Sequence, residues 1–168
     1  YCITLSSQYV LKEIKNKSKL TLLRETIKTD TNINILIAKS LIKKGYKKIG
    51  VLGLSYKGNL KVDILSPVIP FVKHLRSKGI NVSLFDPYYS NKEIAKIVGV
   101  KSFKYPQDLS KFDCVVISID HKEFKANIKN ITKYLTNCKY ILDNMKVWEK
   151  INFPKHITYK ISGEKNWI

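Results

Sequence analysis

The stretch of residues 47–67 constrains the fold more than any other part of the chain. It begins with Lys48–Leu54, a short apolar run flanked by glycine and lysine, which is the pattern of a strand buried on both faces. A glycine-rich turn follows, and Ser66 then provides a favourable N-cap with Pro67 in the first position of a helix. A strand, a turn and a helix in this order predict the first unit of an α/β sheet.

The turn itself carries features of an anion site. Amide groups at a helix start can bind a phosphate, and Lys57 lies beside them in the sequence. However, Gly50, Gly53 and Gly58 do not have the GxGxxG spacing of a dinucleotide-binding turn. Two interpretations are therefore open, a nucleotide site or an ordinary tight turn between a strand and a helix.

Strands and helices continue to alternate after this unit. We expect helices at 66–78, 91–98 and 122–135, helical turns at 106–110 and 147–150, and strands at 81–85, 101–103, 113–119, 139–142 and 157–161. This alternation predicts an α/β fold, a Rossmann-like doubly wound parallel sheet with helices on both faces. Ligands of such sheets bind beyond the carboxyl ends of the strands. Gly53–Gly58, Asp86, Asp120-His121 and Asp143-Asn144 all fall there.

Residues 1–45 are expected to form a helical arm that precedes a compact domain of residues 46–168. Apolar residues recur at helical spacing over 21–44, and Gly45 suits the end of that helix. A weak point for a break lies near Asp30–Asn32. Because this helix would expose an apolar face alone, we expect it to pack on the domain or on a second subunit.

Composition excludes general disorder and a membrane-spanning segment. Hydrophobic residues make up 44% of the chain, but no apolar run approaches the length of a span. The formal net charge of +18 is high enough for a polyanionic partner such as nucleic acid. Against this, nearly all of the excess is lysine, which recognises bases less well than arginine, and the lysines are scattered along the sequence.

No metal site is predicted. Cys2, Cys114 and Cys138 have neither CxxC spacing nor metal-ligand spacing with the histidines. Cys114 lies in an apolar run and is expected to be a buried structural thiol. The odd cysteine count and the absence of a visible signal peptide predict a reducing, cytoplasmic location. Because the chain begins at Tyr1, we expect it to be a processed product or a piece of a longer protein.

Four motifs in order, GVLGLSYKGNLKVDILSP, NVSLFDPY, DCVVISIDHKEF and YILDN, resemble a known family. They are similar to the C-terminal UDP-binding domain of the UDP-glucose/GDP-mannose dehydrogenase family, and most similar to its UDP-N-acetylhexosamine dehydrogenase branch. The resemblance covers residues 46–148. The helix over 21–44 resembles the family's central helix, around which subunits dimerise.

The resemblance implies the C-terminal part of an enzyme that oxidises the C6 alcohol of a nucleotide sugar to a carboxylate in two NAD-dependent steps. The implied partners are a UDP-sugar and either a second copy of the chain or a missing N-terminal part. NAD is the implied cofactor, and its main binding domain does not lie within these residues.

The resemblance also implies site residues. A family cysteine holds the aldehyde as a thiohemiacetal, and the similar segment YCITLSSQYV would make Cys2 this nucleophile. Gly53, Tyr56 and Lys57 would bind the substrate, together with Lys146.

Several positions depart from the family's pattern. Ser6 stands where an aspartate helps to activate water, and Ile64 and Met145 stand where arginines line the cofactor and substrate sites. Lys146, next to Met145, could supply a point charge instead. Because lost charges slow such reactions by orders of magnitude, a second interpretation stays open. The chain could be an inactive relative reused as a basic nucleic-acid-binding or structural component of a nucleoprotein assembly.

Three further positions each have two interpretations. Asp86 could bond a ribose hydroxyl or brace the turn that follows with Pro87. His121 could act as a general base or, as the family's similar motif implies, belong to a capping segment of the next helix. Trp148 could stack on a base or pack in the core.

Overall fold

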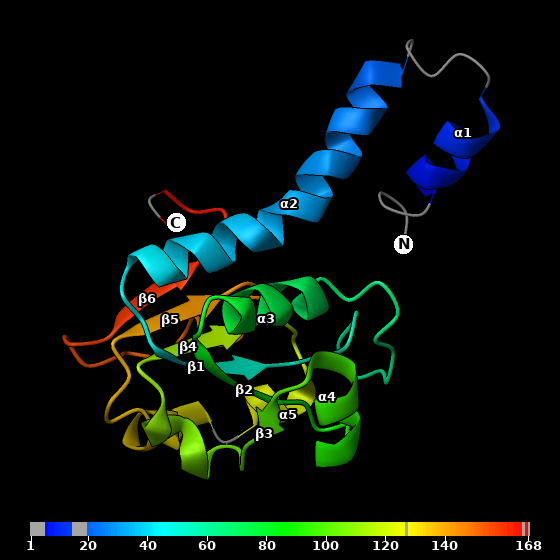
Figure 1. Ribbon diagram of the computed structural model, residues 1–168. Helices are drawn as coiled ribbons and strands as arrows, with labels where there is room; N and C mark the ends of the chain where they lie inside the picture. Colours follow the sequence, from blue (N-terminus) through cyan, green and yellow to red (C-terminus); the bar gives the residue numbers. More distant parts are fainter. Residues whose placement is uncertain (1–5, 15–19, 127, 166, 168) are drawn as a thin grey trace.

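The computed structural model describes residues 6–14, 20–126, 128–165 and 167. Its centre is a 6-stranded parallel sheet in the order β3-β2-β1-β4-β5-β6 (Figure 1). This order confirms the predicted Rossmann-like, doubly wound sheet. The strands are β1 (Lys48–Leu52), β2 (Asn81–Phe85), β3 (Lys101–Ser102), β4 (Cys114–Ile117), β5 (Tyr140–Asp143) and β6 (Thr158–Ile161).

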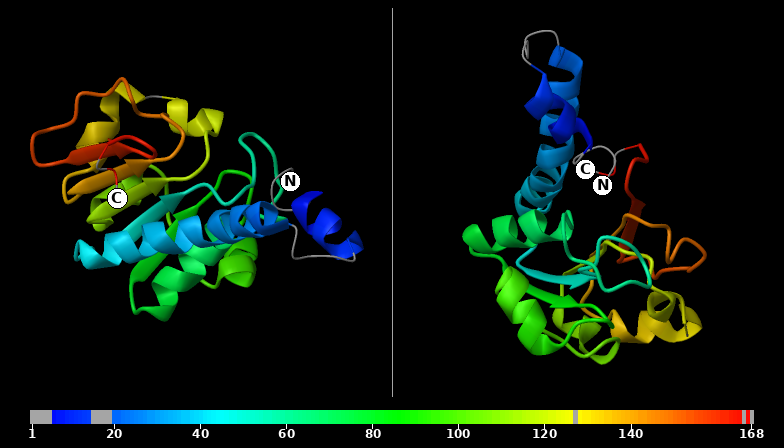
Figure 2. Two further views of the ribbon diagram at one scale, coloured as in Figure 1. Left: turned by 90° about the horizontal axis from the view of Figure 1, so that it is seen from above. Right: turned by 90° about the vertical axis from the view of Figure 1, so that its right-hand side faces the viewer.

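Helices cover both faces of the sheet (Figures 1 and 2). The first face packs against α2 (Thr21–Lys43), α3 (Val68–Ser77) and α4 (Asn91–Val98). The second packs against the 3₁₀ helix η3 (Gln107–Lys111), the short α5 (Lys122–Lys125) and the 3₁₀ helix η4 (Ile128–Tyr134). A further short helix, α1 (Ser7–Glu13), precedes α2.

Successive side chains of the strands enter the two cores alternately, as the pleat requires. In β1, Val51 joins the core under α2 and α3, whereas Leu52 joins the core on the other face, together with Phe124 and Trp148. Trp148 is fully buried and its indole N–H donates to the Phe124 carbonyl at 2.9 Å, so it is a core residue and not a stacking platform.

Most predicted elements are present, with changed ends. The first strand ends at Leu52 and not at Leu54. The single helix predicted over 122–135 is wrong, because Ala126 is extended and α5 ends after one turn, with η4 following. The apolar pattern there reflects burial against the sheet, while Asn130 and Thr132 are weak helix formers.

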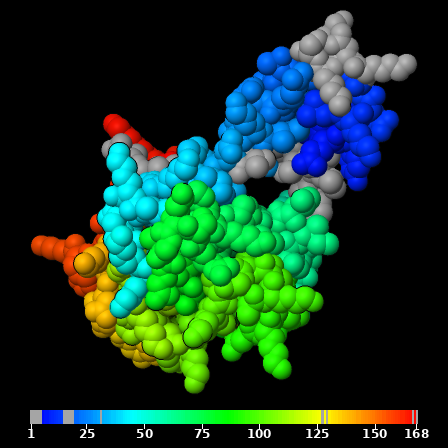
Figure 3. Space-filling view, viewed as in Figure 1, coloured from blue at the N-terminus to red at the C-terminus, as the bar shows by residue number. Residues whose placement is uncertain are grey.

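The helix α2 is continuous through the expected weak point near residue 30. Its C-terminal half packs on the domain through Ile37, Ala38 and Leu41. Its N-terminal half extends away from the domain (Figure 3), and Leu22 there is 84% exposed. Within the described ranges, no helix has both the length and the apolarity that crossing a bilayer requires.

Candidate functional site

The strand order reverses between β1 and β4, and in such folds the crevice for a ligand lies beyond the carboxyl ends of these strands. Backbone hydrogen bonds extend past the strand ends and hold the emerging loops together. The Gly53 N–H donates to the Phe85 carbonyl at 2.8 Å, and the Ser118 N–H donates to the Leu52 carbonyl at 2.9 Å. The loops after β1, β2 and β4 therefore start from one rigid edge.

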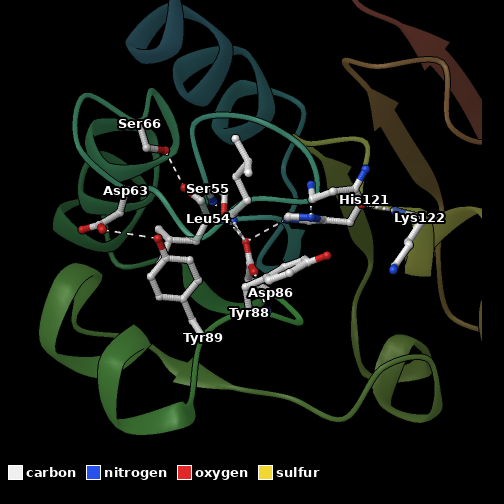
Figure 4. A network of polar contacts seen from close by, with 11 residues as sticks. Leu54, Ser55, Asp63, Ser66, Asp86, Tyr88, Tyr89, His121 and Lys122 are labelled. Carbon is white, nitrogen blue, oxygen red and sulfur yellow. Dashed lines mark hydrogen bonds and ion pairs between the residues drawn. The ribbon is translucent and has the colours of Figure 1, made fainter.

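Asp86, directly after β2, is the centre of a buried polar network at this edge (Figure 4). Its Oδ2 accepts hydrogen bonds from the backbone N–H groups of Leu54 at 2.7 Å and Ser55 at 3.0 Å, and from the Ser55 hydroxyl at 3.2 Å. Its Oδ1 accepts from the Tyr88 N–H at 2.9 Å. The carboxylate thus braces its own turn and the glycine-rich loop, which supports the bracing interpretation over a ribose contact.

The environment of Asp86 favours its ionised form. Burial acts to raise its pKa, but the hydrogen bonds from His121, Leu54, Tyr88 and Ser55 outweigh that effect and lower the pKa below its ordinary value. The carboxylate is therefore a fixed negative charge within the fold.

His121 connects this network to the glycine-rich loop. The ring is fully buried, with Nε2 at 3.1 Å from Asp86 Oδ2, and Nδ1 accepts from the Asn59 backbone N–H at 2.9 Å. Because both nitrogens are engaged inside the protein, the general-base interpretation fails for this arrangement. The helix-opening interpretation is confirmed in position, because His121 is the N-cap residue of α5, although its side chain makes no cap hydrogen bond.

The side-chain cap of α5 comes from Asn59, on a different loop, and the sequence interpretation missed it. Its Oδ1 accepts from the Lys122 N–H at 2.9 Å, so one loop residue contacts both His121 and the helix start. Asn59 has a φ of +60°, a conformation that asparagine tolerates better than most residues. The adjacent Gly58-Asn59 pair was the available signal, since such pairs mark turns.

The helix α3 begins one residue later than predicted, with Pro67 in the N-cap position, and Ser66 lies just before it. The Ser66 hydroxyl accepts from the Val68 N–H at 3.2 Å and donates to the Leu54 carbonyl at 2.6 Å. These contacts join the start of α3 to the end of β1. The hydroxyl is buried and engaged, so a phosphate would have to approach α3 without it.

The loop after β5 is held by Asp143, another buried carboxylate. Asp143 accepts from the N–H groups of Met145 at 2.9 Å and Trp148 at 2.8 Å, and from the Tyr159 hydroxyl at 2.8 Å. Burial and this hydrogen bond raise the pKa of Tyr159, so its phenol stays a donor. The loop between these anchors presents Lys146 to solvent.

The structure places the predicted substrate-binding residues on the loops after β1 and β5, at the carboxyl edge of the sheet. Lys57 is exposed and Tyr56 half-buried on the first loop, and Lys146 is exposed on the loop after β5. Their parent strands, β1 and β5, are separated only by β4, which corresponds to about 10 Å. Cys2, the predicted nucleophile, lies outside the described residues.

Gly53 is buried and has a structural reason to be glycine. Its φ is +97°, and a Cβ there would lie 2.7 Å from the Ile119 Cβ. At Gly58, the corresponding space is taken by the Asp120 carboxylate. The protein's own side chains thus occupy the close approaches that these glycines permit.

A cavity of about 40 Å³ lies between α2, the start of α3 and the ends of β4 and β5. This volume can hold water but is too small for a nucleotide. The residues that line this cavity are Asn34, Ile37, Pro67, Val68, Phe71, Val116, Ser118 and Asn144.

Two of the departures noted in the sequence lie exposed at this edge. Ile64 is 66% exposed and Met145 is 44% exposed. These apolar side chains contribute no charge where the resemblance leads one to expect arginine. Ser6, the third departure, is exposed next to α1.

The two described cysteines are structural. Cys114 and Cys138 are buried, and burial raises the pKa of the Cys114 thiol well above its usual range and that of Cys138 to about 12. Neither is a nucleophile in this state. Among the residues that the structure describes, no group of histidines, cysteines and carboxylates could hold a metal ion.

Comparison with known proteins gives consistent matches. Residues 50–150 match the UDP-glucose/GDP-mannose dehydrogenase family, UDP binding domain. The UDP-N-acetyl-D-mannosamine dehydrogenase of Methanocaldococcus jannaschii is 28% identical over 171 residues, covering 94% of this chain and 37% of that protein. The enzyme of the same name from Methanococcus aeolicus is 27% identical over 193 residues, covering 100% of this chain and 39% of the relative.

Solved structures share the fold. The UDP-D-ManNAc dehydrogenase of Pyrococcus horikoshii has a TM-score of 0.69 at 23% identity, over 95% of this chain and 37% of that one. The UDP-N-acetyl-mannosamine dehydrogenase of Staphylococcus aureus has a TM-score of 0.67 at 21% identity, over 90% and 35% of the two chains. This chain therefore spans well under half the length of these relatives.

Proposed function

The chain belongs to the UDP-glucose/GDP-mannose dehydrogenase family, and we propose that it is the UDP-sugar-binding part of an NAD-dependent UDP-N-acetylhexosamine 6-dehydrogenase. The observation that carries the proposal is that the match to the UDP binding domain, residues 50–150, reaches from β1 through β5 and includes the loops that bear Lys57 and Lys146. The UDP-N-acetyl-D-mannosamine dehydrogenases among its relatives support the hexosamine branch. In this proposal, residues 1–45 end the family's dimerisation region and residues 46–168 form the UDP-binding domain.

Lys57 and Lys146 would neutralise the diphosphate from two sides, and Tyr56 would contact the rest of the ligand. Both lysines are exposed. Asp86 holds the loop of Lys57 through the Leu54 N–H, and Asp143 holds the loop of Lys146 through the Met145 N–H. An ammonium group suits a phosphate as a mobile point charge. The role of Gly53 would be indirect, through the shape of the loop.

The glycine-rich turn does not fit a dinucleotide such as NAD. Ile119 and the Asp120 carboxylate fill the space beside Gly53 and Gly58, where a pyrophosphate would need to approach the backbone. NAD binding and hydride transfer would therefore depend on residues beyond this chain, and Cys2 would be the nucleophile supplied from here.

Replacing Lys57 with alanine is expected to weaken UDP binding about tenfold, because a charge-assisted hydrogen bond to phosphate is lost. Calorimetric titration measures this change. Lys155→Ala is the matched control, since Lys155 is also exposed but lies before β6, at the amino edge of the sheet. If both variants lose the same affinity for UDP, the effect comes from the overall charge of the protein and not from a local contact. That result would contradict the assigned site.

A homodimer through the helix of residues 21–44 is part of the same proposal. Leu22 and Leu36 of α2 are 84% and 51% exposed, which leaves apolar surface for a partner helix. We expect Leu36→Asp to convert a dimer into a monomer in sedimentation velocity experiments. Leu60→Asp, at a site 48% exposed on a loop, should leave the dimer intact. A wild-type chain that is monomeric at all concentrations would refute this part.

Nucleic-acid binding is the competing function, and the distribution of exposed lysines does not favour it. Exposed lysines such as Lys73 on α3, Lys96 on α4 and Lys125 on α5 belong to helices on both faces of the sheet. A polyanion groove requires a continuous basic face. Charge spread over both faces is what general solubility would require.

A further inference from the structure

His121 lies at the junction between the buried carboxylate and the glycine-rich loop. Its Nε2 faces Asp86, and its Nδ1 faces the Asn59 N–H. Its ring packs on Tyr88, with centroids 5.0 Å apart, and on Phe124, at 5.3 Å.

The neighbouring Asp120 carboxylate is paired with Lys125 at 3.3 Å, and the Lys122 side chain is exposed. Asp86 is thus the charged group in direct contact with the ring.

The hydrogen bonds fix the state of this ring. A backbone N–H can only donate, so Nδ1 must carry a lone pair and no proton. The proton of the neutral ring is therefore on Nε2, from which it donates to Asp86. The arrangement requires a neutral histidine of one tautomer.

We propose that His121 is a positioning residue for nucleotide binding, holding the loop of Tyr56 and Lys57 in place through its neutral form and releasing it when Nδ1 is protonated. The inference rests on the proposed UDP-binding function. It concerns a residue that does not itself touch the ligand and that acts through Asn59.

Protonation has opposite effects on the two sides of the ring. At Nε2, the cation would face a carboxylate and the contact would strengthen. At Nδ1, two N–H groups would face each other across 2.9 Å, so the contact with Asn59 must break. The loop would therefore move, and the Asp86 network would stay.

The loop is the weaker partner for a further reason. Asp86 is also held by the N–H groups of Leu54, Ser55 and Tyr88. Asn59, by contrast, is exposed and has a φ of +60°, and its side chain bonds to the Lys122 N–H. Lys57 lies two residues before Asn59, so release of Asn59 displaces the proposed phosphate contact.

The first experiment is nitrogen NMR of the His121 ring in the full chain at a series of pH values from about 5 to 8. We expect the Nε2–H tautomer at pH 8. We also expect the Asn59 amide to lose protection from hydrogen exchange as the ring becomes charged, beyond the change in intrinsic exchange rate. The proposal would be overturned by an Nδ1–H tautomer, or by an Asn59 amide whose protection from hydrogen exchange does not change when the His121 ring becomes charged. Neither result depends on a ligand.

The second experiment compares UDP affinity at the two ends of this range. Wild-type affinity should fall about tenfold with the lost contact, in addition to the effect of the ligand's own phosphate ionisation. His121→Gln cannot be protonated, so its affinity should follow the ligand's ionisation alone. Asn59→Gly keeps the backbone N–H and should retain the wild-type pH dependence.

The outcomes separate the two proposals. If the wild type and His121→Gln show the same pH dependence, the positioning role is overturned while UDP binding stands. If UDP binds at no pH, the proposed function fails, and the Asn59 exchange measurement still decides whether protonation of His121 releases the loop.

Discussion

Replacing Asp86 with alanine is expected to lower the free energy of unfolding by about 4 kcal/mol. The carboxylate accepts from the buried N–H groups of Leu54 and Ser55, from the Tyr88 N–H and from His121. Its removal leaves several of these donors without a partner, and each buried orphan costs about 1–3 kcal/mol. Urea denaturation followed by circular dichroism measures the loss.

Asp113 offers a matched control for this substitution. Its carboxylate also accepts from two consecutive N–H groups, those of Lys47 at 3.0 Å and Lys48 at 3.1 Å. That site is exposed, so water replaces the lost acceptor and Asp113→Ala should cost only about 1 kcal/mol. Equal costs at the two sites would contradict the central structural role of Asp86.

The Asp86 carboxylate also makes the stability of the fold depend on pH in the acid range. Because its pKa is lower in the folded state, the stabilisation is complete above the unfolded pKa of about 4 and is lost as the pH falls below it, toward the folded pKa. The wild type should therefore lose stability more steeply below about pH 4 than Asp86→Asn does. Parallel acid denaturation curves would mean that Asp86 is not the group responsible.

Gly53→Ala is expected to cost about 3 kcal/mol, the second large effect. Alanine at a φ of +97° is strained, and its Cβ would lie 2.7 Å from the Ile119 Cβ, which belongs to a buried and branched side chain. We expect a lower midpoint in urea, and weaker UDP binding because the loop of Lys57 begins here.

Gly45→Ala separates strain from collision. Gly45 has a similar φ of +86°, but nothing lies within 4 Å of its Cβ position. Its substitution should cost about 1 kcal/mol, the strain alone. If Gly53→Ala lowers the free energy of unfolding no more than this control does, Ile119 can move aside without cost. The loop would then be less rigid than we infer.

The sheet was predictable because each strand carries its own local signal. The runs at β1 and β2 are short, apolar and bounded by turn residues, and Ser90 with Glu93 forms the capping box that starts α4 where it was predicted. The split of the predicted helix at Ala126 was not visible, because burial against the second face produces the same apolar pattern as a longer helix.

The bracing network was only partly predictable. Asp86 could be assigned to its own turn because the Asp-Pro pair is local. The contacts of His121 join residues 62 and 35 positions away, and no local pattern encodes such pairs. The capping role of Asn59 was missed for the same reason, since it caps a helix 63 residues later in the chain.

Calorimetric titration of UDP into the purified chain at moderate salt tests the central claim most directly, with single-stranded RNA titrated in parallel. The account predicts saturable binding of UDP and at most weak, salt-sensitive binding of RNA. RNA binding that falls steeply with salt, together with no binding of UDP, would contradict it and would show that the dehydrogenase fold here serves another function.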